Sequence, residues 1–468
     1  MEMDRENVWK KYAASELAEL NTINDRYKAC LDEGKTEREC VKLAVRELKA
    51  KGYRDLKEVE QDEKPQLKAG DKVYAVCMDK SIAAFQIGRQ PLENGMNILG
   101  AHIDSPRIDV KQNPLYENEE LAYLDTHYYG GIKKYQWVTI PLAIHGVIAK
   151  KDGTVTEVSI GDKADDPVFV ITDLLIHLAS QQLEKKAGVV IEGEKLDLLI
   201  GSCPLAKVEG LDEEEKELVK ANMLELLKQY YDMEEEDFVS AELEIVPAGN
   251  ARDCGFDRSM VLAYGQDDRV CAFTSLFAML EVEDLERTAC CILVDKEEIG
   301  SVGATGMHSR FFENVVAELV ALTVGESELK VRRALQNSKM LSSDVSAAYD
   351  PMFAETFEKR SSAFFAKGLV FNKFTGSRGK SGSNDANAEY LAEVRRAMDA
   401  QNVAYQFAEL GKVDIGGGGT IAYIMANYGM EVIDSGVAVM SMHAPWELTS
   451  KADVYEAYKG YKAFLVEM

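Results

Sequence analysis

The stretch Arg269–Asp295, RVCAFTSLFAMLEVEDLERTACCILVD, places two kinds of regular structure in close succession. Its first half, RVCAFTSLFAMLEV, predicts a helix, and TACCILVD is a short apolar run typical of a buried strand. A further helical pattern, FFENVVAELVALTV, follows at residues 311–324. Because strands that alternate with helices form mostly parallel sheets, this region predicts an α/β fold.

The same alternation extends in both directions from this stretch. Two helical patterns with apolar residues at i, i+3, i+4 and i+7 fall within residues 5–50. We predict strands at residues 71–79, 81–88, 97–104, 339–346 and 436–444, and helices at residues 388–401, 421–430 and 451–467. The predicted core is therefore a mostly parallel-stranded sheet that is flanked by helices.

The pattern changes between about residues 105 and 250. Residues 134–153 are rich in strand-forming residues, and residues 241–249 predict another strand. Helices are predicted at residues 167–186 and at the acidic stretch 212–238. We interpret residues 105–250 as an inserted, mainly β domain that divides the α/β domain into two parts, residues 1–104 and 251–468.

The composition is that of a globular protein with a strongly acidic surface. Asp and Glu total 80 against 54 Lys and Arg, so the formal net charge is −26. Such a surface repels nucleic acid and anionic membranes, and we expect neither as a partner. Carboxylates are, however, ordinary ligands of divalent cations.

Three features indicate a cytoplasmic protein. The eight cysteines include no C-x-x-C pair, and the adjacent Cys290 and Cys291 lie in an apolar run. This usage is typical of reduced thiols that pack as small apolar residues. The first residues, MEMDRENVWKK, lack the apolar segment of a signal peptide, and no stretch has the ~20 apolar residues of a membrane span.

Five short stretches place histidine or carboxylate residues directly after an apolar run or at the start of a helix. They are AHIDSP (101–106), GQDDR (265–269), VDKEEIGS (294–301), SSDVS (342–346) and SMHAP (441–445). Ligands bind outside the carboxyl ends of the strands in open α/β sheets, so distant stretches can meet in one cavity. Two histidines with several carboxylates and no thiolate favour a site for two metal ions.

Each stretch also has a simpler explanation when it is taken alone. An Asp at a helix start, such as Asp267 or Asp268, commonly caps the helix, and a lone histidine such as His443 is commonly a core residue. Glu297 and Glu298 are harder to explain in this way, because they follow a buried strand and precede a glycine-rich segment. One glutamate of such a pair can bind metal while the other acts as a base. The five stretches together support the metal site.

The stretches AHIDSP, QDDR, DKEEIGS, SSDVS and MHAPWE have the order and spacing found in one group of enzymes. The chain resembles the aspartyl aminopeptidase and aminopeptidase I family of dinuclear zinc peptidases. The resemblance extends over essentially the whole chain, with the insertion included. It implies a zinc-peptidase-like α/β fold and a metal-dependent aminopeptidase with two divalent ions per subunit, zinc in the first place, with cobalt or manganese as alternatives.

The resemblance also implies a role for individual residues. His102 and Asp344 bind one ion, Asp267 bridges the two ions, and Glu298 and His443 bind the second. Glu297 is the general base, and Asp104 orients His102. The usual Asp-Asn pair of the family is Asp-Asp here, so Asp268 is the alternative to Asp267 as the bridging ligand.

The inserted segment in the family is a dimerisation domain, and the dimers form a tetrahedral dodecamer. TDLLIHLAS resembles the family's segment that carries a histidine into a neighbouring site, which corresponds to His177. The family name implies acidic N-terminal residues, for which Lys373, Arg378 and Lys380 are the candidate cations. Acidic-specific members place a lysine where this chain has Asn372, so action on neutral residues is the alternative.

Two other functions are compatible with part of this pattern. A related dinuclear hydrolase, such as a deacylase or carboxypeptidase, shares the metal ligands but needs an arginine for the substrate carboxylate. A self-assembling scaffold with the same fold would lose some ligands or Glu297. All the positions above carry competent residues, which argues against the scaffold.

Overall fold

The computed structural model describes residues 6–206 and 217–468, and these divide into two compact units. Unit 1 consists of the described residues within 1–104, 251–442 and 447–468, and unit 2 of those within 105–250 and 443–446. The short segment 443–446 thus belongs with the inserted residues, although it lies far from them in the sequence.

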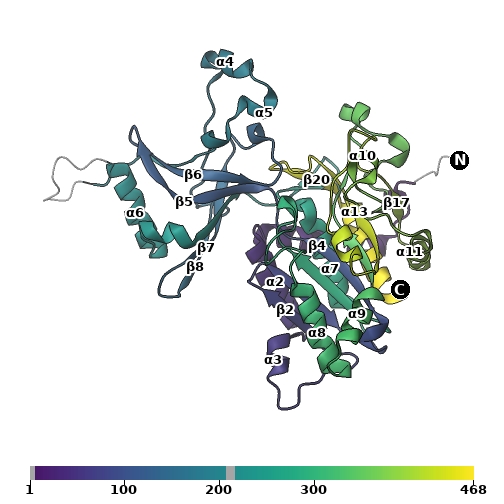
Figure 1. Cartoon of the computed structure of the whole chain (residues 1–468). Helices are drawn as coiled ribbons and strands as arrows, with labels where there is room; N and C mark the ends of the chain where they lie inside the picture. Colours follow the sequence, from purple (N-terminus) through teal and green to yellow (C-terminus); the bar gives the residue numbers. More distant parts are fainter. Residues whose placement is uncertain (1–5, 207–216) are drawn as a thin grey trace. The chain divides into compact units, whose positions relative to one another are not determined.

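Unit 1 is built on a nine-stranded sheet whose central strands are parallel (Figure 1). The strands lie in the order β1 (Arg54–Asp55), β2 (Lys72–Cys77), β3 (Ser81–Gln86), β13 (Thr288–Val294), β4 (Met96–His102), β14 (Lys339–Ser343), β18 (Glu431–Gly436), β16 (Leu369–Asn372) and β17 (Tyr405–Phe407). The pairs β13–β4, β4–β14 and β14–β18 are parallel, so these four strands end at the same edge.

Side chains of the central strands alternate between two hydrophobic cores. Leu99 and Leu341 belong to one core, and their neighbours Ile98 and Met340 belong to the other. This period of two buries both faces of the sheet, which explains the continuous apolar runs of its strands. The predicted α/β fold with a mostly parallel sheet is confirmed.

Helices cover both faces of this sheet. The first core packs against α1 (Ala14–Glu33), α2 (Glu37–Ala50), α7 (Gln266–Glu281), α11 (Ala388–Ala400) and α13 (Lys451–Glu467). The second packs against α3 (Leu56–Glu60), α8 (Phe311–Val324), α9 (Glu328–Gln336) and α12 (Ala422–Ala426). Helix α7 is buried along nearly its whole length, which explains why RVCAFTSLFAMLEV is apolar on every side.

Unit 1 also contains a smaller sheet that lies beside the start of α7. Its strands are β11 (Arg252–Cys254), β12 (Met260–Ala263), β20 (Glu447–Ser450), β19 (Ala438–Met440) and β15 (Ser346–Ala347). Strand β12 leads into α7 through Tyr264 and Gly265, and Gly265 has a positive φ of 70° that suits glycine.

Unit 2 is a six-stranded antiparallel sheet, in agreement with the predicted mainly β insertion. Its order is β8 (Val155–Ile160), β7 (Leu142–Ala149), β10 (Ala241–Pro247), β5 (Arg107–Asn118), β6 (Leu121–Tyr129) and β9 (Leu198–Gly201). Helix α6 (Leu218–Tyr231) lies within the predicted acidic helix 212–238, of which residues 212–216 fall outside the described residues.

The helix predicted at residues 167–186 is wrong. Phe169 and Val170 form β-bridges with Leu142 and Leu199, and only a 3-10 turn, Ile176–Leu178, and a short helix, α4 (Ser180–Leu183), follow. The apolar side chains in the middle of this stretch, Leu174–Leu178, are instead exposed, with Ile176 68% accessible. Their spacing therefore reflects an exposed apolar surface.

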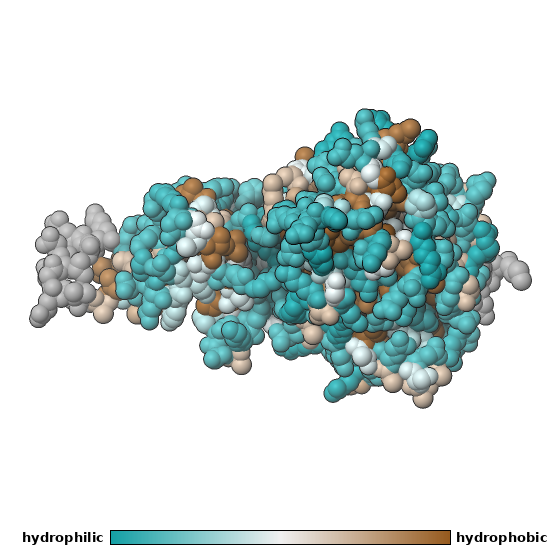
Figure 2. Space-filling model, turned by 90° about the horizontal axis from the view of Figure 1, so that it is seen from below, coloured by the Kyte–Doolittle hydropathy of each residue, from teal (hydrophilic) through white to brown (hydrophobic). Residues whose placement is uncertain are grey.

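Hydrophilic residues cover most of the molecular face in Figure 2, as the excess of carboxylates predicts. Among the helices of the described residues, none combines the length and apolar character needed to cross a membrane.

Candidate metal centre

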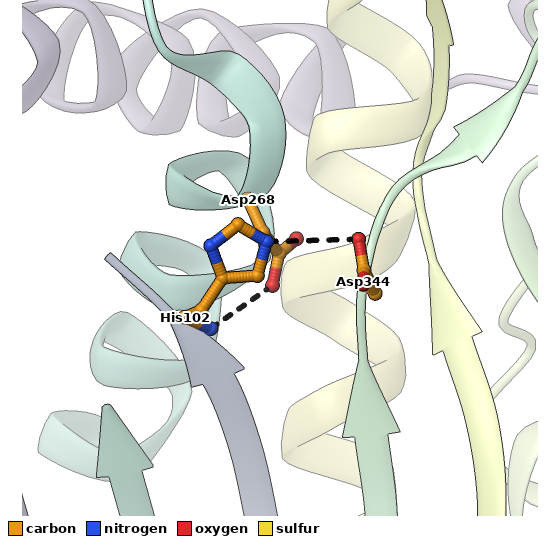
Figure 3. Close-up of side chains that lie close together, drawn as sticks. All are labelled: His102, Asp268 and Asp344. Carbon is orange, nitrogen blue, oxygen red and sulfur yellow. Dashed lines mark hydrogen bonds and ion pairs between the residues drawn. The ribbon is translucent and has the colours of Figure 1, made fainter. Parts of the chain in front are cut away.

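The carboxyl ends of three parallel strands bring the predicted ligands of unit 1 together. His102 is the last residue of β4, and Asp344 follows directly after β14. Glu297 and Glu298 lie in a 3-10 turn, Glu297–Ile299, just beyond β13. The first turn of α7 supplies the two aspartates, Asp267 and Asp268. Figure 3 shows Asp268 beside His102 and Asp344.

These side chains form two overlapping groups that suit metal ions. His102, Asp268 and Asp344 place ligand atoms within 4.8 Å of one another, and so do His102, Asp267 and Glu298. The Nε2 atom of His102 lies 3.3 Å from Asp267 Oδ1 and 3.8 Å from Asp344 Oδ1. It also lies 4.0 Å from Glu297 Oε2. The centre of unit 1 thus gathers one imidazole and five carboxylates.

Asp104 connects the histidine to the two glutamates. Its carboxylate accepts hydrogen bonds from the backbone N–H groups of Glu297 and Glu298, each at 3.1 Å. One of its oxygens also lies 3.3 Å from His102 Nδ1, and its own backbone carbonyl lies 2.9 Å from that nitrogen. These contacts hold Nδ1, so that Nε2 faces the carboxylates.

The close packing of buried carboxylates makes a bound positive charge favourable in this cluster. Burial, reinforced by the nearby Asp344, raises the pKa of Asp268 well above its usual range and that of Glu297 to about 8. Burial alone lowers the pKa of His102, but Asp104, Asp267 and Asp344 hold it well above its usual value. Protons accumulate here because buried carboxylates lie close together.

A divalent ion fits this donor set. Imidazole and carboxylate oxygens are ordinary zinc ligands, and an ion would replace the protons that the cluster otherwise attracts. Asp268 Oδ1 is buried and has no hydrogen-bond partner within residues 6–206 and 217–468. A buried carboxylate oxygen without a partner is costly, and a cation close to it would offset that cost.

The two other predicted histidines lie in unit 2. His443 is partly exposed, and its Nδ1 lies 2.9 Å from the carbonyl oxygen of Gly131. His177 is exposed in the 3-10 turn between Ile176 and Leu178. Neither belongs to the two groups of potential ligands found among the described residues.

The candidate cations for an acidic substrate side chain are exposed and mostly paired. Asp385 lies 3.0 Å from the Nζ of Lys380 and 3.9 Å from that of Lys373. Arg378 and Lys380 border a cavity of about 300 Å³ that Glu409 and Asp414 also line. Asn372 is buried and donates to Ser346 Oγ. The charge of this region is therefore mixed.

Sequence reasoning assigned no role to three buried residues that touch the centre. Arg269 donates through Nε to the carbonyl of Ile103, the residue between His102 and Asp104. Glu447 accepts a hydrogen bond from the backbone N–H of Asp267, and Gln266 donates to the backbone carbonyl of Glu447. Their only signal in the sequence was their place inside the quoted stretches QDDR and MHAPWE.

Comparison with known proteins gives matches over nearly the whole chain. Residues 30–465 match the family model described as aminopeptidase I zinc metalloprotease (M18). The "Probable M18 family aminopeptidase 1" of Clostridium acetobutylicum is 60% identical over 459 residues, which cover 98% of this chain and 97% of that protein.

Solved structures agree with this match. The crystal structure of aminopeptidase I from Clostridium acetobutylicum superimposes with a TM-score of 0.91 at 58% identity, covering 99% of this chain and 100% of that one. The S. cerevisiae mApe1 dodecamer shares the fold with a TM-score of 0.75 at 20% identity, covering 96% and 97% of the two chains.

Proposed function

The chain belongs to the M18 family of aminopeptidase I zinc metalloproteases, and we propose that two zinc ions in each subunit serve its aminopeptidase activity. Members of this family are metallo-exopeptidases that act on peptides. The observation that supports the proposal is the sharing of His102 by two groups of ligand atoms, one with Asp344 and one with Glu298.

The proposed ligands divide between the two ions. His102 and Asp344 would hold the first ion, Glu298 and His443 would hold the second, and Asp267 would be shared by both. The two overlapping groups of ligand atoms support this division, since Asp344 belongs to one group and Asp267 and Glu298 belong to the other. His443 is included because of its place in MHAPWE.

Each remaining group has a task in peptide hydrolysis. Bound zinc would acidify water and polarise the scissile carbonyl. Glu297 takes the proton of the attacking water and returns it to the leaving amine. Asp104 fixes the backbone of Glu297, so that the base keeps its position while the proton moves. The surrounding carboxylates attract the protonated amino terminus of the peptide, which favours exopeptidase action.

Removal and return of metal tests this function. The chelated protein is expected to lose activity on aminoacyl-p-nitroanilides, and added Zn²⁺, Co²⁺ or Mn²⁺ is expected to restore it. The same preparation should not cleave peptides from the carboxyl end or deacylate N-acyl amino acids. Activity that survives complete chelation would contradict the metal mechanism. Cleavage from the carboxyl end by the metal-loaded protein would contradict the aminopeptidase assignment.

We propose broad action on neutral N-terminal residues, in preference to acidic ones. An acidic side chain needs a cation that is not already neutralised. Asp385 pairs with both Lys373 and Lys380, and the position occupied by lysine in acidic-specific members is the buried, uncharged Asn372. A panel of aminoacyl-p-nitroanilides with different amino acids distinguishes a neutral from an acidic preference. An acidic preference would give the Asp and Glu substrates the highest kcat/KM.

We further propose that unit 2 is the dimerisation domain and that dimers assemble into a dodecamer, as the S. cerevisiae mApe1 chains do. Leu174, Leu175, Ile176 and Leu178 are all exposed around His177. Adjacent exposed apolar side chains of this kind mark protein interfaces. Contact with a second subunit would cover them and bring His177 to the neighbouring subunit's substrate.

Charge placed in this segment is expected to disrupt the assembly. The double change Ile176→Asp and Leu178→Asp should reduce the particle mass measured by light scattering, because association would bury two unpaired carboxylates. Leu329→Asp is the matched control, since Leu329 is similarly exposed, at 56%, but lies in α9 of unit 1. An unchanged mass of the double variant would contradict the role of this segment.

A further inference from the structure

Glu447 is a buried carboxylate that contacts the backbone of a proposed metal ligand. It is the first residue of β20, and only 1% of its surface is accessible. Its Oε2 atom accepts a hydrogen bond of 2.9 Å from the N–H of Asp267. The register of the small sheet explains this contact, since Glu447 pairs with Ala263, just before the chain turns into α7.

The hydrogen bond meets a specific need at the start of α7. The first N–H groups of a helix have no partner within the helix. Asp267 has the non-helical angles φ −78° and ψ 111°, which set the direction of its side chain apart from that of the following helix. A carboxylate that accepts its N–H is also favoured by the helix dipole.

Gln266 and Tyr27 extend this contact into the core. The side-chain amide of Gln266 donates to the backbone carbonyls of Glu447, at 2.6 Å, and Val261, at 3.2 Å. The hydroxyl of Tyr27, from α1, donates to Gln266 Oε1 at 3.0 Å. All three side chains are almost completely buried, so their geometry is fixed by packing as well as by hydrogen bonds.

We propose that Glu447 is a positioning residue for the metal centre, and that Gln266 and Tyr27 hold it in place. The glutamate fixes the backbone of Asp267 and thereby directs the carboxylate of Asp267 toward His102 and Glu298. It touches neither substrate nor metal. Loss of a group that holds a metal ligand in position without binding the metal typically weakens metal affinity by ~10–100-fold.

The test compares two substitutions of Glu447 in the full-length protein. Glu447→Met keeps the volume but removes the acceptor, and it should weaken Zn²⁺ binding ~10–100-fold in competition with a chromogenic chelator. Glu447→Gln keeps an acceptor oxygen and should restore most of the affinity. The absorption spectrum of the Co²⁺-loaded protein should shift in the Met variant and remain like that of the wild type in the Gln variant.

Asp453 supplies a matched control. It is a buried carboxylate of the same unit and accepts backbone N–H groups from Ala366 and Gly368, at 2.7 and 2.8 Å. Asp453→Leu should lower the melting temperature and leave the Zn²⁺ affinity unchanged. A general loss of stability is thereby separated from an effect on the metal centre. If Glu447→Met does not fold, Gln266→Leu removes the support of Glu447 and is expected to weaken Zn²⁺ binding in the same direction.

This inference rests on the proposed role of Asp267 as a ligand. The variant Asp267→Asn distinguishes a failure of that ligand role from a failure of the positioning role of Glu447. Loss of zinc in Asp267→Asn together with full affinity in folded Glu447→Met would overturn only the positioning role. Unchanged zinc content in Asp267→Asn would overturn the ligand assignment itself. Equal weakening in Glu447→Met and Glu447→Gln would also overturn the inference, because charge and not the hydrogen bond would then be responsible.

Discussion

Replacement of Glu297 by glutamine is expected to lower kcat by about 10²–10⁴-fold while the zinc content remains unchanged. Glutamine has the same shape but does not accept a proton. The backbone N–H at this position still donates to Asp104, so the turn that carries the side chain should keep its geometry. Burial and the nearby Asp344 raise the pKa of Glu297 to about 8 in the absence of metal.

The measurement pairs steady-state kinetics with metal analysis of the same sample. Glu298→Gln is the control, since Glu298 is the neighbouring glutamate in the same turn and is a proposed ligand. The control should lose metal as well as activity. Loss of zinc from Glu297→Gln would instead identify Glu297 as a ligand, and near-normal turnover would remove it as the base.

The central part of the fold follows from local patterns in the sequence. The apolar runs before His102, Asp295 and Asp344 are strands that are buried on both faces, and parallel strands end at one edge. Side chains that follow such strands therefore meet without any knowledge of the contacts between them. For this reason, the positions of His102, Glu298 and Asp344 were predictable from strand ends, whereas Asp267 comes from the first turn of α7.

The supporting contacts were not predictable in the same way. Tyr27 and Gln266 are separated by more than two hundred residues, and their hydrogen bond depends on how α1 packs beside α7. Glu447 reaches Asp267 only because of the register between β12 and β20. No periodicity in a single segment contains this information.

The segment around His177 shows a different limit. Leu174, Leu175 and Leu178 have a spacing compatible with one apolar helix face, and a helix is the ordinary interpretation of that spacing. The backbone instead pairs with strands at Phe169 and Val170 and leaves the leucines exposed. If this segment contacts a second subunit, as proposed above, its apolar residues are buried only in the assembly and give no regular pattern of burial within their own chain.

The two aspartates at the start of α7 are expected to respond differently to replacement by asparagine. Asp267 lies with His102 and Glu298, and Asp268 with His102 and Asp344. A bridging ligand needs a negative oxygen for each ion, which asparagine does not provide, so Asp267→Asn should lose zinc and reduce activity by about 10²-fold or more. Asp268→Asn recreates the Asp-Asn pair that is usual in the family, and this variant should retain zinc.

A local contact supports the tolerance expected at position 268. Asp268 Oδ2 accepts a hydrogen bond from the backbone N–H of His102 at 3.4 Å, and an asparagine oxygen can accept it equally. Burial and Asp344 raise the pKa of Asp268, and the neutral asparagine avoids that unfavourable charge. Zinc analysis and kcat of the two variants decide the assignment. If Asp268→Asn loses metal and Asp267→Asn keeps it, the bridge belongs to Asp268, and Glu447 then supports a residue that binds no more than one ion.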